Sequence, residues 1–140
     1  DRFLIKVSLG YPDEESEKRM LARAFEDRRG SVVASQGIDV LAERTKAQAV
    51  ALNTATLDYL YRLVRATREP SAFRLGLSPR AALGLVAITK AWAYLHNRSH
   101  ATPDAVREVF PSVAAHRVFP TTLTPMHAIE GLLQHLPIHA

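Results

Sequence analysis

The chain has 140 residues, 47% of them hydrophobic, which is enough for one domain with a buried core. It contains no cysteine, no signal-peptide pattern and no apolar run near the ~20 residues of a membrane span, so we expect a cytoplasmic protein without disulfides or a membrane span. The formal net charge of +4 is compatible with nucleotide phosphate and with nucleic acid. Strand-forming runs are scarce after residue 9, which favours an all-helical domain.

Residues 3–9 alternate as a β-strand does. Every second residue there is apolar, and the pattern ends at a turn sequence: Phe3, Ile5, Val7 and Leu9, then Gly10-Tyr11-Pro12. A lone strand leaves its backbone hydrogen-bonding groups unpaired. We therefore expect its sheet to lie in an N-terminal part that precedes Asp1, although a partner strand elsewhere in the chain is the alternative.

Two helices are predicted for residues 13–50. Asp13 can cap a helix that runs to about Arg29, with an inward face made by Met20, Leu21, Ala24 and Phe25. After a loop over residues 30–37, a weaker helix is predicted from Ile38 to about Val50, with an apolar face of Ile38, Leu41, Ala42 and Val50.

Two longer helices follow in the middle of the chain. Asn53 or Thr54 caps a helix that ends before Glu69-Pro70, with Leu57, Leu60, Tyr61 and Val64 facing inward. A loop over residues 71–77 leads to a helix from Pro79 to about His96, capped by Ser78. The apolar face predicted for this helix is Leu83, Val86, Ala87, Ala91, Tyr94 and Leu95.

The last part of the chain repeats the same start signal. Thr102-Pro103-Asp104 begins a helix that bears Val106, Val109 and Phe110 and is broken by Pro111. Thr124-Pro125 begins a final helix, whose apolar residues are Ile129, Leu132, Leu133 and Leu136.

Arg80 carries the main chemical signal of the sequence. It follows Ser78 and Pro79, so it lies in the first turn of the predicted helix. The free N–H groups of that turn already carry partial positive charge, and a cation there is unfavourable unless an anion occupies the site. The pattern therefore predicts a phosphate-binding position.

Three stretches, taken in order, resemble the C-terminal part of MoxR-family AAA+ ATPases. The first two are Asp1-Arg2-Phe3-Leu4-Ile5-Lys6-Val7 with Gly10-Tyr11-Pro12, and Leu57-Asp58-Tyr59 through Leu63-Val64-Arg65-Ala66-Thr67-Arg68. The third is Leu75-Gly76-Leu77-Ser78-Pro79-Arg80-Ala81-Ala82-Leu83, followed by Thr102-Pro103-Asp104-Ala105-Val106 and Ala115-His116-Arg117. Each motif alone is weak, whereas their ordered occurrence over residues 1–118 is specific.

The resemblance implies an all-α helical bundle, the AAA+ lid, preceded by one orphaned β-strand from an ATPase core. Residues 1–11 would be the last strand of that α/β core, and residues 12–118 would be the helical lid. Residues 119–140 would form a C-terminal amphipathic tail.

The resemblance also implies roles for individual residues. Arg80, within Ser78-Pro79-Arg80, is similar to the sensor-2 arginine that reaches the γ-phosphate of ATP bound by the same subunit. Arg2 is similar to an arginine finger that acts on the ATP of a neighbouring subunit. The chain has no Gly-x-x-x-x-Gly-Lys-Ser/Thr loop (Walker A) and no acidic strand end for Mg²⁺ (Walker B). ATP and Mg²⁺ are therefore expected only in the full-length protein, and the chain alone is expected not to hydrolyse ATP.

The resemblance thus implies a nucleotide-sensing lid that couples ATP binding and hydrolysis to remodelling of a client protein or to metal-cofactor insertion. The expected partners are the lid's own ATPase core and the neighbouring subunits of a ring, a hexamer. The alternative is a free-standing basic helical module that binds nucleic acid or a partner protein. A third hypothesis, a purely structural adaptor, has less support from the sequence than either of these. The helix after Thr102 is poor in base-reading side chains, which argues against nucleic acid.

Each candidate residue also has a structural interpretation. Ser78-Pro79-Arg80 can be an ordinary helix start, and Arg2 a solvated strand flank. A basic stripe of Arg62, Arg65 and Arg68 is more typical of a solvated face, and His116 of packing or interdomain contact. No metal site is expected, because the histidine pairs lack a His-Glu-x-x-His pattern; the pairs are His96 with His100 and His135 with His139.

Overall fold

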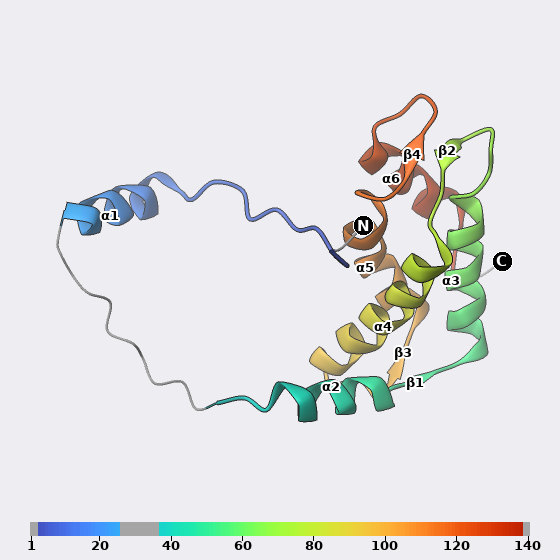
Figure 1. The fold of residues 1–140 in the computed structure, drawn as a ribbon, viewed down its shortest axis with the longest axis horizontal. Coiled ribbons are helices and arrows are strands. Elements are labelled where there is room, and N and C mark those ends of the chain that lie inside the picture. Colours follow the sequence, from blue (N-terminus) through green and yellow to red (C-terminus); the bar gives the residue numbers. More distant parts are fainter. Residues whose placement is uncertain (1–2, 26–36, 139–140) are drawn as a thin grey trace. The chain divides into compact units, whose positions relative to one another are not determined.

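The computed structural model describes residues 3–25 and 37–138 of the chain (Figure 1). The chain forms two compact units, one made of Val7–Ile38 and a larger one made of Asp1–Lys6 together with Asp39–Ala140. The smaller unit contains helix α1, and the larger unit contains the other described helices and strands. The candidate residues Ser78, Pro79 and Arg80 belong to the larger unit.

Helix α1 (Glu14–Phe25) begins where the sequence predicts. Oδ1 of Asp13 accepts a hydrogen bond of 2.8 Å from the backbone N–H of Ser16, and this bond is the largest of the causes that hold the pKa of Asp13 below its ordinary value. The predicted inward position of Met20 and Leu21 is wrong, because both side chains are more than half exposed. Among the described residues of this unit, no second element covers them. The predicted continuation of the helix lies outside the described residues.

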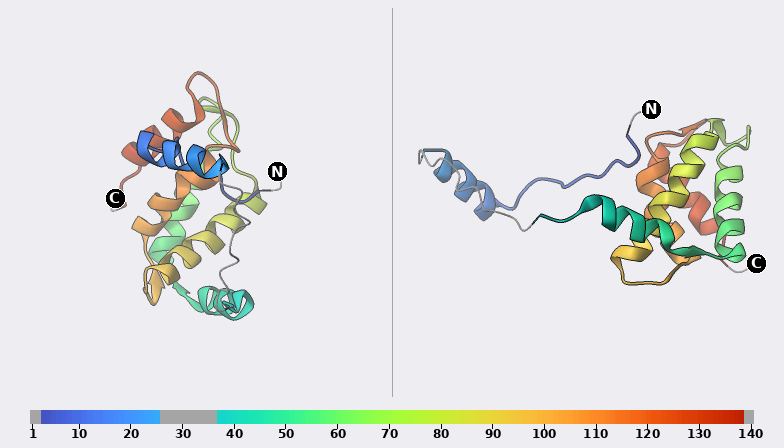
Figure 2. Two further views of the ribbon diagram at one scale, coloured as in Figure 1. Left: turned by 90° about the vertical axis from the view of Figure 1, so that its left-hand side faces the viewer. Right: turned by 60° about the horizontal axis from the view of Figure 1, so that its bottom comes forward.

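The larger unit is a helical bundle, which confirms the predicted fold class. Its described helices are α2 (Val40–Ala49), α3 (Thr54–Ala66), α4 (Pro79–Leu95), α5 (Pro103–Ala114) and α6 (Pro125–His135). Helix α5 lies centrally and packs against α3, α4 and α6 (Figure 1, Figure 2).

Two short ladders accompany the helices. Strand β1 (Ala51–Leu52) pairs in parallel with β3 (His100–Ala101), and β2 (Phe73–Leu75) pairs antiparallel with β4 (Phe119–Pro120). The prediction of a loop over residues 71–77 is therefore wrong in part, since β2 lies within it. Ladders of two or three residues are too short to leave an alternating pattern in the sequence.

The helix starts follow the predicted cap chemistry. In α3 to α6 the cap side chain accepts a hydrogen bond from the backbone N–H three residues later, and the caps are Asn53, Ser78, Thr102 and Thr124. Proline occupies the first turn of α4, α5 and α6, where its missing N–H removes no intrahelical bond. Asp39 caps α2, one residue after the predicted start at Ile38.

The core of the larger unit lies between α3, α4, α5 and α6. Its largest fully buried apolar side chains are Tyr59, Phe110, Leu63, Leu77, Leu85 and Ile129. The predicted inward faces of α5 and α6 are confirmed: Val106, Val109, Phe110 and Ile129 are buried, and Leu132, Leu133 and Leu136 pack against the core. Burying one large apolar side chain stabilises the fold by about 1.5–3 kcal/mol, so these residues are the main source of its stability.

The predicted apolar face of α4 is wrong in part, although Val86 and Tyr94 are half-buried and pack against buried residues. Leu83 and Leu95 are 73% and 71% exposed, whereas the buried positions are Ala81, Leu85, Thr89 and Ala93. Helix α4 is apolar around most of its circumference, so its sequence does not show which stripe faces the core. The packing of α4 between α2 and α5 selects the stripe instead.

The faces of α3 and α2 also differ from the prediction. In α3, Leu60 and Val64 are buried as predicted, but Leu57 and Tyr61 are exposed while Tyr59 and Leu63 are fully buried. In the second helix, Ile38 and Leu41 are exposed, and α2 has no buried residue. Val50, directly after α2, is buried against Ala93 and Ala101, whereas α2 itself packs on α4 without burying a side chain.

Pro111 does not break α5 as predicted. The helix continues through it to Ala114, and the backbone N–H of Ala115 still donates to the carbonyl O of Pro111 at 3.0 Å. A proline inside a helix costs roughly 3 kcal/mol. Val113 and Ala114 are fully buried in the turn after it, and this burial offsets the cost.

Residues 3–9 do not form the predicted strand. The structure assigns no strand to them, and no described residue pairs with them in a ladder. A strand needs a neighbouring strand to satisfy its backbone. Instead, the backbone N–H of Lys6 donates to the carbonyl O of Ser112, at 2.9 Å, which attaches the first residues to α5. The assignment of residues 1–11 to an ATPase core stays a prediction.

Candidate functional site

The loop before α4 is fixed to the end of α3. Thr67 is fully buried, and its hydroxyl donates to the carbonyl O of Val64 at 2.6 Å while it accepts from the backbone N–H of Leu77 at 3.0 Å. Nε of Arg68 donates to the carbonyl O of Leu77 at 2.9 Å. Leu77, one residue before the cap, is itself buried. Its backbone is therefore held on both sides.

Gly76 permits this close approach of the two segments. A Cβ at Gly76 would lie 2.2 Å from the carbonyl O of Thr67 and 2.7 Å from its carbonyl carbon. Because both atoms belong to the backbone, a side chain there would push the loop away from α3. The Leu-Gly-Leu sequence before Ser78 thus sets the position at which α4 begins.

The first turn of α4 presents Arg80 to solvent. Oγ of Ser78 accepts from the backbone N–H of Ala81 at 3.2 Å, and Pro79 has no N–H. The side chain of Arg80 is exposed and makes no hydrogen bond or ion pair with residues 3–25 or 37–138, and its backbone N–H has no acceptor among them. Guanidinium groups and free backbone N–H groups at a helix N-terminus are donors to which anions commonly bind, so the prediction of a phosphate contact at Arg80 stands.

Arg2 lies outside the described residues. The position of Arg2 relative to Arg80 therefore stays a prediction. Phe3, which follows Arg2, belongs to the same unit as α4.

The other arginines of the predicted basic stripe have different surroundings. Nη2 of Arg62 donates to the carbonyl oxygens of Pro137 and Ile138, at 3.3 and 3.2 Å, and its guanidinium lies 5.3 Å from the ring centroid of Tyr59. Arg68 binds Leu77 as described above. Two of the three arginines thus tie neighbouring segments of the larger unit together, whereas Arg65 is exposed.

The histidines give no metal site in the described part of the chain. Among those residues, no group of three His, Cys, Asp or Glu side chains is close enough to hold a metal ion. Nδ1 of His96 lies 2.9 Å from the carbonyl O of Trp92, and Nδ1 of His135 lies 2.7 Å from that of Gly131. His139 lies outside the described residues.

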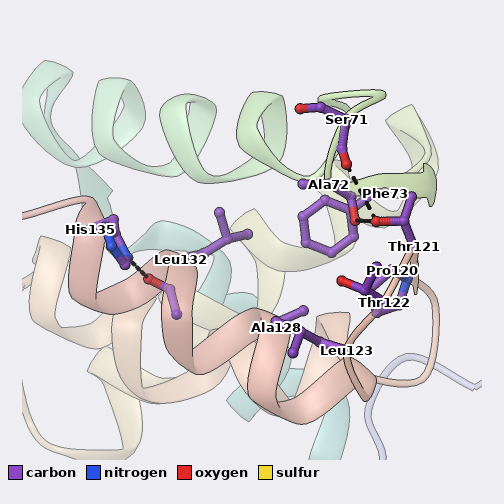
Figure 3. A pocket seen from close by; sticks show the side chains of 11 residues that line it. Ser71, Ala72, Phe73, Pro120, Thr121, Thr122, Leu123, Ala128, Leu132 and His135 are labelled. Atoms are coloured by element: carbon purple, nitrogen blue, oxygen red, sulfur yellow. Dashed lines mark hydrogen bonds between the residues drawn. The ribbon is translucent and has the colours of Figure 1, made fainter.

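A pocket of about 360 Å³ lies beside β2, β4 and α6 (Figure 3). Its lining includes the apolar side chains of Phe73, Ala128 and Leu132, together with polar residues such as Thr121 and His135. No Lys or Arg is among its lining residues, so the pocket has no counter-charge for a phosphate. This hollow is therefore not the nucleotide contact that Arg80 predicts.

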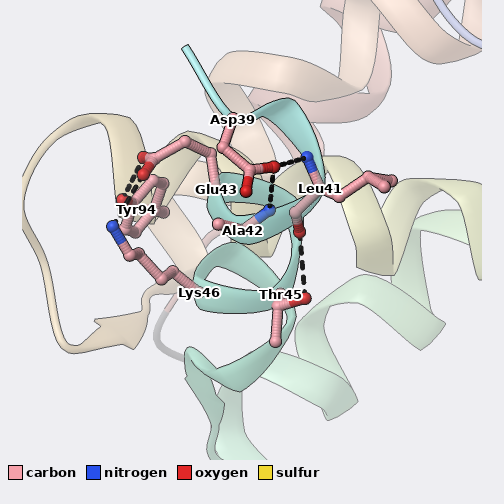
Figure 4. Close-up of polar contacts among 7 residues, drawn as sticks. All are labelled: Asp39, Leu41, Ala42, Glu43, Thr45, Lys46 and Tyr94. Atoms are coloured by element: carbon pink, nitrogen blue, oxygen red, sulfur yellow. Dashed lines mark hydrogen bonds and ion pairs between the residues drawn. The ribbon is translucent and has the colours of Figure 1, made fainter.

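A polar cluster joins α2 to α4 (Figure 4). Oε1 of Glu43 lies 2.7 Å from Nζ of Lys46, and the hydroxyl of Tyr94 donates to Oε2 of Glu43 at 2.5 Å. The hydrogen bond from Lys46, followed by that from Tyr94, lowers the pKa of Glu43, and the bond to Glu43 raises the pKa of Tyr94. Each polar group of the cluster is satisfied by another member of it, so the cluster has a structural role: it connects α2 to α4.

Comparison with known proteins defines the class. Residues 65–134 match the AAA lid domain family, which is half of the chain and includes Ser78, Pro79 and Arg80. The chain therefore belongs to the AAA lid domain family. No described helix is both long enough and apolar enough to cross a membrane.

Individual relatives show which group of AAA+ proteins the chain is similar to. The chain is 33% identical to "Chaperone MoxR1" of Mycobacterium tuberculosis over 155 aligned residues, which cover 96% of this chain and 40% of that protein. It is 29% identical to "Protein MoxR" of Paracoccus denitrificans over 142 residues, covering 85% of this chain and 41% of that one. The chain is thus a MoxR-like AAA+ lid region, and it spans about 40% of the length of these relatives.

A solved structure supports the same fold. A crystal structure of a candidate ATPase from Cytophaga hutchinsonii superposes with a TM-score of 0.79 at 27% identity, over 97% of this chain and 46% of that one.

Proposed function

We propose that the chain is the nucleotide-sensing lid of a MoxR-like AAA+ ATPase, in which Arg80 contacts the γ-phosphate of ATP held by the ATPase core of the same subunit. The observation that carries this proposal is the exposed guanidinium of Arg80, free of described partners, in the first turn of α4. The planar fork of Arg suits phosphate oxygens, and the partial charge of the helix N-terminus adds to it.

The rest of the nucleotide site would come from outside this chain. ATP and Mg²⁺ would be held by Walker A and Walker B sequences in the ATPase core, since this chain contains neither. Arg2 would act in trans on the ATP of a neighbouring subunit in a hexameric ring, where an arginine finger contributes on the order of 10³ to 10⁵ in turnover. The cytoplasm, where ATP is available, is the compartment that we propose.

The lid would work by a change in its contact with the phosphate. While ATP is bound, Arg80 would hold the lid against the core, and hydrolysis would release that contact. The movement would be passed around the ring to remodel a client protein or to support insertion of a metal cofactor. The chaperone name of the Mycobacterium tuberculosis relative supports a client protein.

The test compares Arg80→Ala with Arg74→Ala in the full-length ATPase that contains this lid. Arg74 is an exposed arginine of β2 with no described partner, which makes it a matched control. We expect Arg80→Ala to lower turnover roughly tenfold or more, the scale of losing one charge contact to the transition state, and Arg74→Ala to be nearly silent. Wild-type turnover in a folded Arg80→Ala variant would refute the sensing role.

Arg80→Lys separates charge from geometry. A flexible ammonium keeps the positive charge but cannot reproduce the two-pronged contact of a guanidinium. We therefore expect Arg80→Lys to recover little of the lost turnover, with circular dichroism confirming that both variants stay folded.

A further inference from the structure

The segment 3–6 is bound to the larger unit through its backbone. The guanidinium of Arg117 donates to the carbonyl oxygens of Phe3 and Leu4, and Nε2 of His116 lies 3.3 Å from the same carbonyl O of Phe3. The N–H of Lys6 donates to the carbonyl O of Ser112, at 2.9 Å. The three residues that hold the segment, Ser112, His116 and Arg117, lie in the last turn of α5 and just after it.

Arg117 is well placed to hold these carbonyl groups. Its Nη1 also donates to the carbonyl O of Val113 at 2.7 Å, so the end of α5 orients the guanidinium. A cation there complements the partial negative charge of the helix C-terminus. Burial lowers the pKa of Arg117, and the carbonyl oxygens replace part of the water that the guanidinium loses.

The side chain of Leu4 packs against α4 at Gly84, which has no side chain of its own. A Cβ at Gly84 would lie 2.4 Å from Cδ1 of Leu4, so any larger residue at Gly84 would displace the Leu4 side chain. Gly84 follows Arg80 by four residues within α4, and positions four apart lie on the same helix face. Segment 3–6 therefore packs on the face of α4 whose first turn presents Arg80.

We propose that Arg117 is a positioning residue that ties the chain next to Arg2 to the end of α5, and α5 packs against α4, the helix that carries Arg80. Arg117 holds the carbonyl groups of Phe3 and Leu4. When α4 and α5 move, the backbone that follows Arg2 therefore moves with them. The two proposed phosphate-contacting arginines are then linked mechanically: the state of one nucleotide is passed to the position of a residue that serves another. This inference rests on the proposed function.

The first experiment measures the attachment itself in the 140-residue chain. Hydrogen exchange of the Lys6 amide reports it, because that N–H is protected by Ser112 in the bound segment. We expect Arg117→Ala to speed this exchange roughly tenfold and Arg117→Lys to restore part of the protection, since one ammonium can still bind a carbonyl. Unchanged exchange in Arg117→Ala would overturn the attachment.

Arg107→Ala is the matched control for that experiment. Arg107 lies on α5 and, like Arg117, donates from Nη1 to a backbone carbonyl, that of Leu136 at 3.3 Å, but it has no hydrogen bond to segment 3–6. We expect it to leave Lys6 exchange as in the wild type. Gly84→Leu, which acts on Leu4 from α4, is expected to speed exchange as Arg117→Ala does, and an unchanged rate would overturn the packing of Leu4 on α4.

The second experiment measures the coupling in the full-length ATPase, with Arg2→Ala, Arg117→Ala and the double variant. If Arg117 acts by positioning Arg2, we expect each single change to lower kcat with little change in KM, and the double variant to be no slower than Arg2→Ala. Multiplied losses in the double variant would overturn the coupling, because a merely structural role of Arg117 is independent of Arg2. Failure of the proposed function appears separately, as an Arg80→Ala enzyme with wild-type turnover.

Discussion

The backbone N–H of Leu77 donates a 3.0 Å hydrogen bond to the hydroxyl of Thr67, ten residues earlier in the chain and fully buried. The hydroxyl in turn donates to the carbonyl O of Val64, so one side chain satisfies a loop and a helix end together. The first turn of α4, with Arg80, begins just beyond this bond. The bond therefore connects the stability of the bundle to the placement of the candidate phosphate contact.

Replacing Thr67 by Val should destabilise the larger unit by about 1–3 kcal/mol, since the buried N–H of Leu77 loses its acceptor. Urea unfolding of the 140-residue chain measures this change. Thr45→Val is the control, because the Thr45 hydroxyl makes a similar bond to the carbonyl O of Leu41 but at an exposed position, where less than about 0.5 kcal/mol is expected. Equal losses in both variants would contradict the role of burial.

Gly76→Ala should destabilise the fold by about 1–3 kcal/mol, because the new Cβ would meet the Thr67 backbone at 2.2 Å. Gly131→Ala in α6 is the opposite case, because no atom outside its own helix turn lies within 4 Å of the place its Cβ would take. A gain of roughly 0.5–1 kcal/mol is expected there from better helix propensity. Thermal unfolding should thus shift in opposite directions for the two variants. A stabilised Gly76→Ala chain would show that the loop can move away from α3.

The 140-residue chain alone should show no ATP hydrolysis above background and only weak nucleotide affinity. It has no phosphate-binding loop, and Arg80 offers a single charge-assisted contact. Phosphate release and equilibrium titration with ATP measure the two properties. Turnover that disappears in Arg80→Ala made in the same way would contradict this expectation.

Deleting residues 1–10 should leave the helical content of the chain unchanged, because the core side chains lie in α3 to α6 and the residues next to them. It should also reduce self-association, since the deletion removes a segment of strand-like pattern with exposed apolar side chains such as Phe3 and Val7. Circular dichroism and sedimentation measure these effects. Loss of the fold would show that the segment belongs to the core.

Stability should fall in acid partly through Glu43. Hydrogen bonds from Lys46 and Tyr94 lower the pKa of its carboxyl in the folded chain below the ordinary value of 4.5. The contribution is therefore fully present above pH 4.5 and is lost as pH falls through the folded-state pKa. Glu43→Gln should flatten this part of the thermal stability profile against pH, whereas Glu130→Gln, at an exposed position on α6, should not.

The helix starts were predictable because their chemistry is local. Ser78, Thr102 and Thr124 each satisfy a backbone N–H three residues away, so a short stretch of sequence contains both partners. For the same reason, the sequence alone predicted that Arg80 lies in the first turn of a helix. The family resemblance followed from such motifs, and the comparisons confirm it.

The inward faces and the long-range contacts were not predictable in this way. Helix α4 is apolar on most sides, and whether Leu83 or Leu85 is buried depends on where α2 and α5 pack. The continuation of α5 past Pro111 depends on burial of the turn beyond it. The attachment of Phe3 to Arg117 joins residues more than a hundred positions apart, and no local pattern encodes it. Such features arise from packing between distant segments, because the free energy that selects them is shared by residues that meet only in the folded chain.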